Sequence, residues 1–179
     1  MGDGLRVLGV DPGTVRTGWG VVECHGSVIR YVESGVIFVG RGEVAGRLAG
    51  VHAGLTQIIA RLAPEILSLE RNFLATNVQS AFRLGEARGV AMAAAAAARV
   101  ALYEYTPATI KKTVVGHGRA GKAGVQEAVT RMLALAAMPL EDEADALAAA
   151  ICYGLRGAFE NKVAAALGVG SRRIRLVRR

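Results

Sequence analysis

Four carboxylates that lie far apart in the chain each stand next to a predicted element boundary: Asp11, Glu70, Asp142 and Asp145. Carboxylates brought to one place repel one another and raise each other's pKa, and a divalent cation relieves that repulsion. All-oxygen ligands suit Mg²⁺ or Mn²⁺ rather than zinc. Two such ions about 3.5–4 Å apart can activate water against a phosphodiester and stabilise the leaving oxygen. The chemistry that these residues favour, if they meet, is metal-dependent phosphodiester hydrolysis.

The first of these carboxylates ends a predicted buried strand. The run from Leu5 to Val10 is mostly apolar and shorter than a helix, and Pro12-Gly13 stops it just after Asp11. Residues 17–23 and 28–39 predict two further strands, which the turn His25-Gly26-Ser27 joins as an antiparallel meander.

A helix and a fourth strand bring in Glu70. Apolar residues recur every three or four positions from Val44 to Leu62, which predicts an amphipathic helix closed by Pro64. The run Glu65 to Leu69 then predicts a strand that Glu70 ends. A helical connection usually returns the chain parallel to the earlier strand. Asp11 and Glu70 would then share the sheet edge at which α/β proteins bind ligands.

The rest of the chain predicts alternating helices and one strand within a single domain. We expect the domain to span residues 1–159 and a basic tail, disordered by composition, to span 160–179. The predicted elements are a long alanine-rich helix Ser80 to Ala98, a strand Val100 to Tyr105, a short helix from Pro107 through Lys112, a helical stripe of Val125, Ala128, Val129, Met132, Leu133 and Ala136, and a last helix Glu141 to Arg156 whose inward stripe is Ala144, Leu147, Ile151 and Leu155.

Asp142 and Asp145 stand three residues apart at the start of that last helix, so they project to one side. Acidic residues in a first helical turn also cap free backbone N–H groups and complement the helix dipole. Glu141 and Glu143 flank Asp142, and the sequence leaves open which of the three would supply a metal ligand.

Basic residues cluster around a glycine-rich loop, Gly116 to Gly121: Lys111, Lys112, Arg119 and Lys122. Lysines at such a loop can contact phosphates. The stretch from Gly116 to Lys122 has the spacing of a nucleotide-binding P-loop, but Ala123 replaces the Ser or Thr that the motif requires. Phe73, just beyond Glu70, could stack on an unpaired base; a core position is its ordinary alternative.

Composition supports a globular protein with an anionic partner. The chain has 179 residues, 52% of them hydrophobic, a net charge of +7 and a pI near 10.0. Such charge favours nucleic acid as partner, with plain solubility as the alternative. Five of the last eight residues are arginine. Two cysteines, no signal-peptide pattern and no apolar run of membrane length lead us to expect a cytoplasmic protein without membrane contact.

Four ordered motifs resemble the RuvC Holliday junction resolvases. They are Gly9-Val10-Asp11-Pro12-Gly13-Thr14 with Thr17-Gly18-Trp19-Gly20, then Leu84-Gly85-Glu86-Ala87-Arg88-Gly89, Lys112-Thr113-Val114-Val115-Gly116 and Ala144-Asp145-Ala146-Leu147-Ala148. The resemblance covers about Leu5 to Leu155. It implies an RNase H-like α/β fold of the retroviral-integrase superfamily, with a five-stranded mixed sheet flanked by helices.

The resemblance also implies roles and partners. The family's four metal-binding positions match Asp11, Glu70, Asp142 and Asp145, and the third of these varies in the family. Its aromatic near the junction centre matches Phe73, and its functional lysines match Lys111 and Lys122. The implied activity is Mg²⁺-dependent cutting of two opposed strands of a four-way DNA junction by a homodimer, with the RuvA–RuvB branch-migration complex as partner. The long alanine-rich helix Ser80 to Ala98 is our own candidate for the dimer interface; ordinary core packing is its alternative, and the two are compatible.

Three other readings stay open on sequence alone. The first is a nuclease of the same fold that acts on RNA or another branched nucleic acid. The second is a nucleic-acid-binding module whose carboxylates only cap helices. The third is an actin-like ATPase, because Asp11-Pro12-Gly13-Thr14 resembles a phosphate-binding turn; that fold pairs two such domains, and this chain has room for one.

Overall fold

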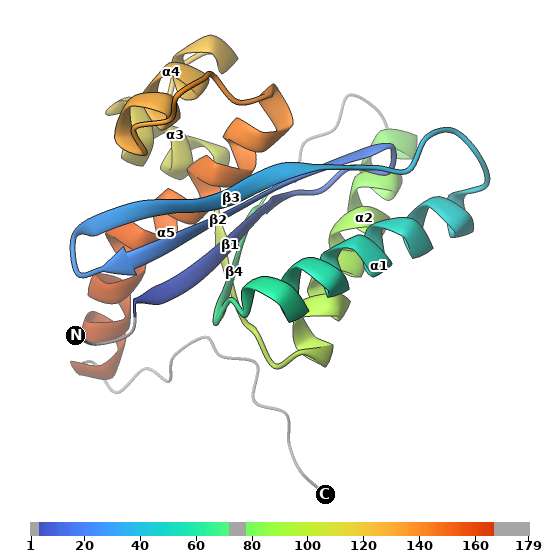
Figure 1. Ribbon diagram of the computed structural model, residues 1–179, viewed down its shortest axis with the longest axis horizontal. Coiled ribbons are helices and arrows are strands. Elements are labelled where there is room, and N and C mark those ends of the chain that lie inside the picture. Colours follow the sequence, from blue (N-terminus) through green and yellow to red (C-terminus); the bar gives the residue numbers. More distant parts are fainter. Residues whose placement is uncertain (1–3, 72–77, 167–179) are drawn as a thin grey trace, which may run out of the picture.

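Five strands form one mixed sheet in the computed structural model, which describes residues 4–71 and 78–166, the last nine of these by their backbone only (Figure 1). The sheet order is β3–β2–β1–β4–β5. The pairs β1–β2 and β2–β3 are antiparallel, whereas β4 runs parallel to β1 and to β5. The predicted meander and mixed sheet are confirmed. The bounds are β1 (Leu5–Asp11), β2 (Arg16–His25), β3 (Val28–Phe38), β4 (Ile66–Glu70) and β5 (Ala101–Tyr105).

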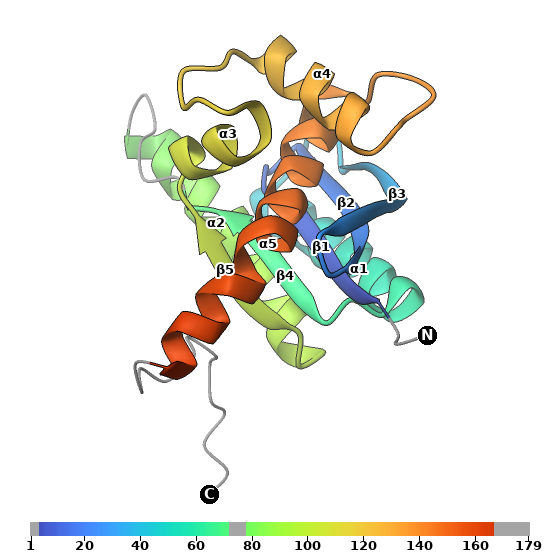
Figure 2. The same cartoon turned by 90° about the vertical axis from the view of Figure 1, so that its left-hand side faces the viewer.

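Helices cover both faces of the sheet. They are α1 (Val44–Leu62), α2 (Val78–Ala97), α3 (Pro107–Val115), α4 (Lys122–Met132) and α5 (Glu141–Ala166). Figure 2 shows α5 lying diagonally across one face, with α3 and α4 gathered over its N-terminal half and with α1 and α2 on the other side of the sheet. Each face has its own hydrophobic core. In the part of the chain that the structure describes, no helix is both long enough and apolar enough to cross a bilayer.

Helix α1 has the bounds that its apolar spacing predicts. Its residues Val51, Leu55 and Ile58 are buried against the sheet. Ala63 adopts a left-handed conformation and its N–H donates to the Ile59 carbonyl at 2.9 Å, which ends the helix just before Pro64. The first residue of the stripe, Val44, is 37% exposed because it precedes the part of the helix that crosses the sheet.

Glycines let α5 lie directly on the sheet. A Cβ on Gly9 of β1 would stand 1.9 Å from the Ala146 carbonyl oxygen, and one on Gly18 of β2 would stand 1.9 Å from the Asp142 carbonyl oxygen. Since both neighbours are backbone atoms of α5, no side-chain rotation relieves either clash. The buried Ser68 hydroxyl of β4 also donates to the Ala149 carbonyl at 2.7 Å. The first turns of α5 are therefore fixed above β1 and β2.

Two helix ends differ from prediction. Helix α5 continues to Ala166 instead of ending at Arg156, because no proline interrupts the sequence there. The predicted domain boundary after residue 159 thus falls inside a helix, and residues 167–179 of the predicted tail lie outside the described residues. Leu155, predicted to face inward, is 41% exposed because α5 has by then passed the sheet.

The second difference concerns α4. The predicted stripe ran to Ala136, but the helix ends at Met132, and Ala134 takes a left-handed backbone conformation that cannot continue it. Met132 is 36% exposed, so the predicted inward position is wrong for this residue, whereas Val125, Ala128, Val129 and Leu133 are buried as expected.

Candidate active site

Two of the predicted carboxylates end neighbouring strands. Val10 pairs with Leu69 in the parallel β1–β4 ladder, so Asp11 and Glu70 follow at the same level of the sheet edge. The predicted shared edge is therefore present. Arg71, next after Glu70, donates its backbone N–H to the Tyr105 carbonyl at 2.7 Å, which extends the β4–β5 pairing past the end of the strand.

The turn after Asp11 is fixed by a buried hydroxyl. Thr17 Oγ1 donates to the Gly13 carbonyl at 2.7 Å and lies 3.3 Å from the Gly13 backbone N–H. Thr17 is fully buried in β2. This arrangement holds the chain in a narrow turn immediately beyond the carboxylate.

The three acidic residues at the start of α5 have different partners. Glu143 Oε2 accepts the Leu140 backbone N–H at 2.8 Å, which is a helix-capping interaction. Glu141 forms an ion pair with Lys122 at the start of α4. Asp142 contributes negative charge that acts on Asp11 and on Asp145. Among the three, Asp142 is therefore the residue whose charge acts on Asp11, and Glu143 has the capping role.

The electrostatics of Asp11 reflect this crowding. The pKa of Asp11 is raised from 3.8 to about 7, mainly by burial and then by the nearby charges of Asp145, Glu70 and Asp142, in that order. Lys122 acts in the opposite direction. Three carboxylates from two other elements thus act on one partly buried carboxylate, which is the convergence that the sequence predicted.

The pKa values of Glu70 and Asp145 are shifted in the same direction. Burial raises the pKa of Glu70, and the charge of Asp145 adds to it, while Lys111 lowers it. Burial likewise raises the pKa of Asp145; the charges of Lys122 and Lys111 lower it, and those of Glu141 and Asp142 raise it. Lys111 on α3 and Lys122 on α4 therefore face the carboxylates from the side that the sheet does not cover.

Arg88, on the other side of Glu70, is a residue that the sequence analysis did not single out. Its Nη1 donates to the Glu70 carbonyl at 2.6 Å, and its Nη2 forms an ion pair with Glu104 of β5. The guanidinium is largely buried and thus joins α2 to the ends of β4 and β5. The Gly-Glu-Ala-Arg-Gly motif contained Arg88, but its partners are distant in sequence and so could not be inferred.

The other predicted contacts divide into two groups. Lys112 lies on α3 and Arg119 lies in the loop after it, and both are exposed. Neither is among the charges that shift the pKa of Asp11, Glu70 or Asp145. Phe73 lies outside the described residues, so its position stays a prediction.

The carboxylates share one rim without forming a closed cage. Within residues 4–71 and 78–157, no three His, Cys, Asp or Glu side chains form a group already arranged to hold a metal ion. The oxygen-only donors and the raised pKa of Asp11 fit a divalent cation such as Mg²⁺.

Known proteins resemble this chain over most of its length. The family model described as crossover junction endodeoxyribonuclease RuvC matches residues 7–153. The RuvC protein of Rubrobacter xylanophilus is 44% identical over 93% of this chain and 92% of its own. That of Alkalilimnicola ehrlichii is 46% identical, over 83% of this chain and 90% of its own.

A solved structure agrees in fold. Thermus thermophilus RuvC in complex with a Holliday junction substrate superposes with a TM-score of 0.81 at 30% identity, covering 87% of this chain and 96% of that one. The matches in sequence and in fold agree, and this chain belongs to the RuvC family of crossover junction endodeoxyribonucleases.

Proposed function

We propose that this protein resolves four-way DNA junctions by paired, symmetric phosphodiester cuts in recombination and repair. The observation that carries the proposal is Asp11: a partly buried carboxylate at a strand end that three other carboxylates act upon, with two lysines facing the same rim. A module that only bound DNA would gain nothing from this unfavourable cluster of negative charge. Family membership identifies the substrate class, since a relative was solved with a Holliday junction.

We propose Asp11, Glu70, Asp142 and Asp145 as the residues that hold two Mg²⁺ ions, with Mn²⁺ as a substitute. Hard oxygen ligands suit these ions. When bound, two such ions activate water and stabilise the charge on the leaving oxygen. The chain's own contribution is positional: β1 and β4 fix two carboxylates from below, and the first turns of α5 bring two more from above.

The lysines have a different task. Lys111 and Lys122 lie close enough to the carboxylates to lower the pKa of Asp145, so a phosphate placed at this rim would meet both cations. We propose that they hold the scissile phosphate against the carboxylates, and that Lys112 and Arg119 bind phosphates farther along the strand. Phe73 is proposed to stack on an unpaired base at the junction centre.

A homodimer suits a substrate with two equivalent strands, because a two-fold axis presents two equal sites to them. We propose α2 as its interface. Val78 and Phe82 are 73% and 70% exposed, and a Cβ on Gly85 or Gly89 would meet nothing within 4 Å. These four residues follow spacings of four, three and four, which place them on one stripe of the helix. The stripe allows a second α2 to approach closely.

Two further proposals concern the partner and the location. RuvA–RuvB is proposed as the partner that delivers the junction, on family membership alone. A cytoplasmic location is proposed because neither of the two cysteines, Cys24 and Cys152, forms a disulfide, although both lie in the part of the chain that the structure describes.

The test compares cleavage of a four-way junction, a linear duplex and an RNA–DNA hybrid in the presence of Mg²⁺. We expect paired cuts in the junction only. Asp11→Asn is expected to bind the junction as the unmodified chain does, because phosphate affinity comes from the basic groups, but to leave it uncut. Glu33→Gln, an exposed carboxylate paired with Arg61, is the matched control and should cut normally. Normal cleavage by Asp11→Asn would refute the site.

A further inference from the structure

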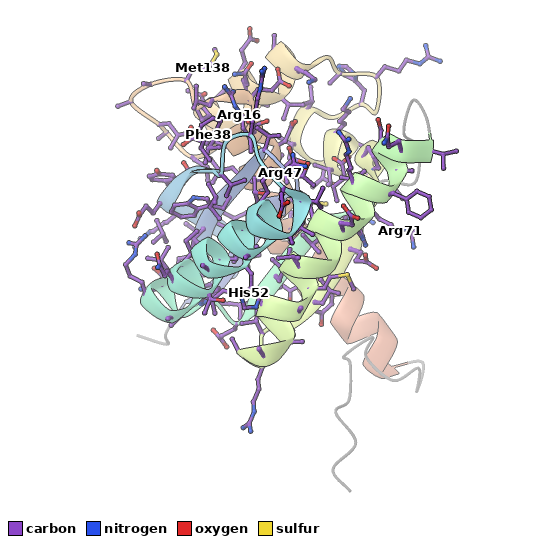
Figure 3. All side chains as sticks on the ribbon, turned by 90° about the vertical axis from the view of Figure 1, so that its right-hand side faces the viewer. Arg16, Phe38, Arg47, His52, Arg71 and Met138 are labelled. Atoms are coloured by element: carbon purple, nitrogen blue, oxygen red, sulfur yellow. The ribbon has the colours of Figure 1, made fainter. Side chains whose placement is uncertain are left out.

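An exposed aromatic side chain lies beside an arginine at the end of the sheet. Phe38, the last residue of β3, is 66% exposed. The guanidinium carbon of Arg16, the first residue of β2, lies 5.8 Å from the centre of the Phe38 ring, and the two residues are partners in the β2–β3 ladder. Both are labelled in Figure 3, close together at that end of the molecule. We refer to them as the Arg16–Phe38 pair.

The pair is held in place by the backbone around it. The Val39 N–H donates to the Val15 carbonyl at 3.1 Å, so the β1–β2 turn and the end of β3 are joined just beyond the pair. A ring beneath a guanidinium orients it and limits its freedom, which favours a directed contact with an anion. Neither side chain is needed in the core, since both are exposed.

The strand register places the pair near the proposed catalytic rim. Asp11 lies opposite Gly18, Gly18 lies opposite Val36, and Phe38 follows two residues later. Two strand spacings of about 4.8 Å and two residues of about 3.3 Å give a separation of roughly 12 Å along the sheet. That span corresponds to about three or four base pairs of duplex at 3.4 Å each.

Charge around the pair favours DNA as the occupant. Arg41 is exposed on the β3–α1 loop. Arg47 on α1 reaches the turn that follows Asp11, where its Nη1 lies 3.5 Å from Thr14 Oγ1. Glu43, the acidic residue of that loop, offsets Arg41, so Arg16 and Arg47 leave the surroundings of the pair with a net positive charge. A basic surface that continues from a phosphodiester-cutting site is suited to the same nucleic acid.

We propose that the Arg16–Phe38 pair binds the duplex arm that flanks the cut strand, with Arg16 on a backbone phosphate and the Phe38 ring against the adjoining deoxyribose. This inference rests on the proposed function, since it takes the junction as substrate. It adds a contact on the β2–β3 side of the site, opposite the lysines of α3 and α4.

The test measures junction binding by fluorescence anisotropy without divalent metal, over a series of salt concentrations. The Arg16→Gln variant loses one phosphate contact. Its slope of log affinity against log salt concentration should therefore be shallower by about 0.9 than that of the unmodified chain. Affinity should fall several-fold in the same variant. Phe38→Ala should show a similar loss, and Phe38→Trp should restore binding because it keeps an aromatic ring. Arg30→Gln, at the other end of β3 and equally exposed, is the matched control and should leave the slope unchanged.

Separate outcomes overturn the two proposals. If the unmodified chain fails to cut the junction in Mg²⁺, the proposed function is wrong. If it cuts normally but Arg16→Gln keeps the full salt slope, or Arg30→Gln loses as much, the inference about the pair alone is wrong. A Phe38→Ala variant that binds like the unmodified chain would also overturn it.

Discussion

Replacing Asp11 with asparagine is expected to stabilise the metal-free protein while abolishing cleavage. The pKa of Asp11 is raised from 3.8 to about 7, first by burial and then by Asp145, Glu70 and Asp142. Above pH 7 the folded chain therefore carries an ionised carboxylate in a place that favours the neutral form. A shift of about three pH units corresponds to roughly 4 kcal/mol of lost stability at most. Asparagine has a similar shape and no charge, so it removes much of this penalty.

The direction of the pH dependence follows from the same shift. Because the folded state binds the proton more tightly than the unfolded state, the contribution of Asp11 to stability falls as pH rises from about 4 to 7 and stays low above that. Thermal unfolding of the metal-free chain should therefore show a falling Tm over this window for the unmodified protein relative to Asp11→Asn. In a domain of this size 1 kcal/mol corresponds to about 2–4 °C, so we expect Asp11→Asn to melt at least about 4 °C higher at pH 8.

Added Mg²⁺ should narrow that difference, because it stabilises the folded state only where the carboxylates can bind it. Glu33→Gln is the control: the Arg61 hydrogen bond lowers the pKa of Glu33, so removing this exposed charge should not raise the Tm. An Asp11→Asn variant that melts at or below the unmodified chain at pH 8 in EDTA would refute the electrostatic reasoning.

Three further predictions test how the site is supported. Arg88→Lys removes the guanidinium that contacts both the Glu70 carbonyl and Glu104. Single-turnover cleavage should slow about tenfold with junction affinity unchanged, whereas equal losses in cleavage and affinity would indicate general damage to the fold. Glu141→Gln releases Lys122 from an exposed ion pair, so junction binding should tighten up to about threefold in an anisotropy titration, and weaker binding would contradict this role. Gly9→Ala should lower the free energy of unfolding by at least about 2 kcal/mol in urea titrations, since its Cβ would clash with the Ala146 carbonyl, while Gly46→Ala, whose Cβ meets nothing, should be neutral or stabilising.

Patterns local in sequence predicted the fold well. The apolar spacing from Val44 to Leu62 gave α1 its observed bounds, and the helix before β4 predicted the parallel pairing that places Asp11 beside Glu70. The extension of α5 was missed because the apolar pattern fades after Phe159, whereas a helix can continue without an apolar stripe.

Contacts between distant elements were beyond sequence reasoning. The three adjacent acidic residues at the start of α5 look alike in sequence. Their different partners separate them: Glu143 accepts a hydrogen bond from Leu140, Glu141 pairs with Lys122, and the charge of Asp142 acts on Asp11. Arg88 illustrates the same limit, because its partners lie on β4 and β5. The Arg16–Phe38 pair depends on strand register, which a shift of one residue would change.

The glycines under α5 link these observations. Gly9 and Gly18 bring the α5 backbone onto β1 and β2, so the distance between the α5 carboxylates and the strand carboxylates is set by backbone contact. Contacts between buried backbones leave little room for movement. The α5 carboxylates and the strand carboxylates therefore cannot reduce their mutual repulsion by a shift of α5 away from the sheet. Lys122, by contrast, is held by an exposed ion pair. We therefore expect the carboxylates to form the more rigid half of the proposed site, and the lysine side to be the half that adjusts to a phosphate.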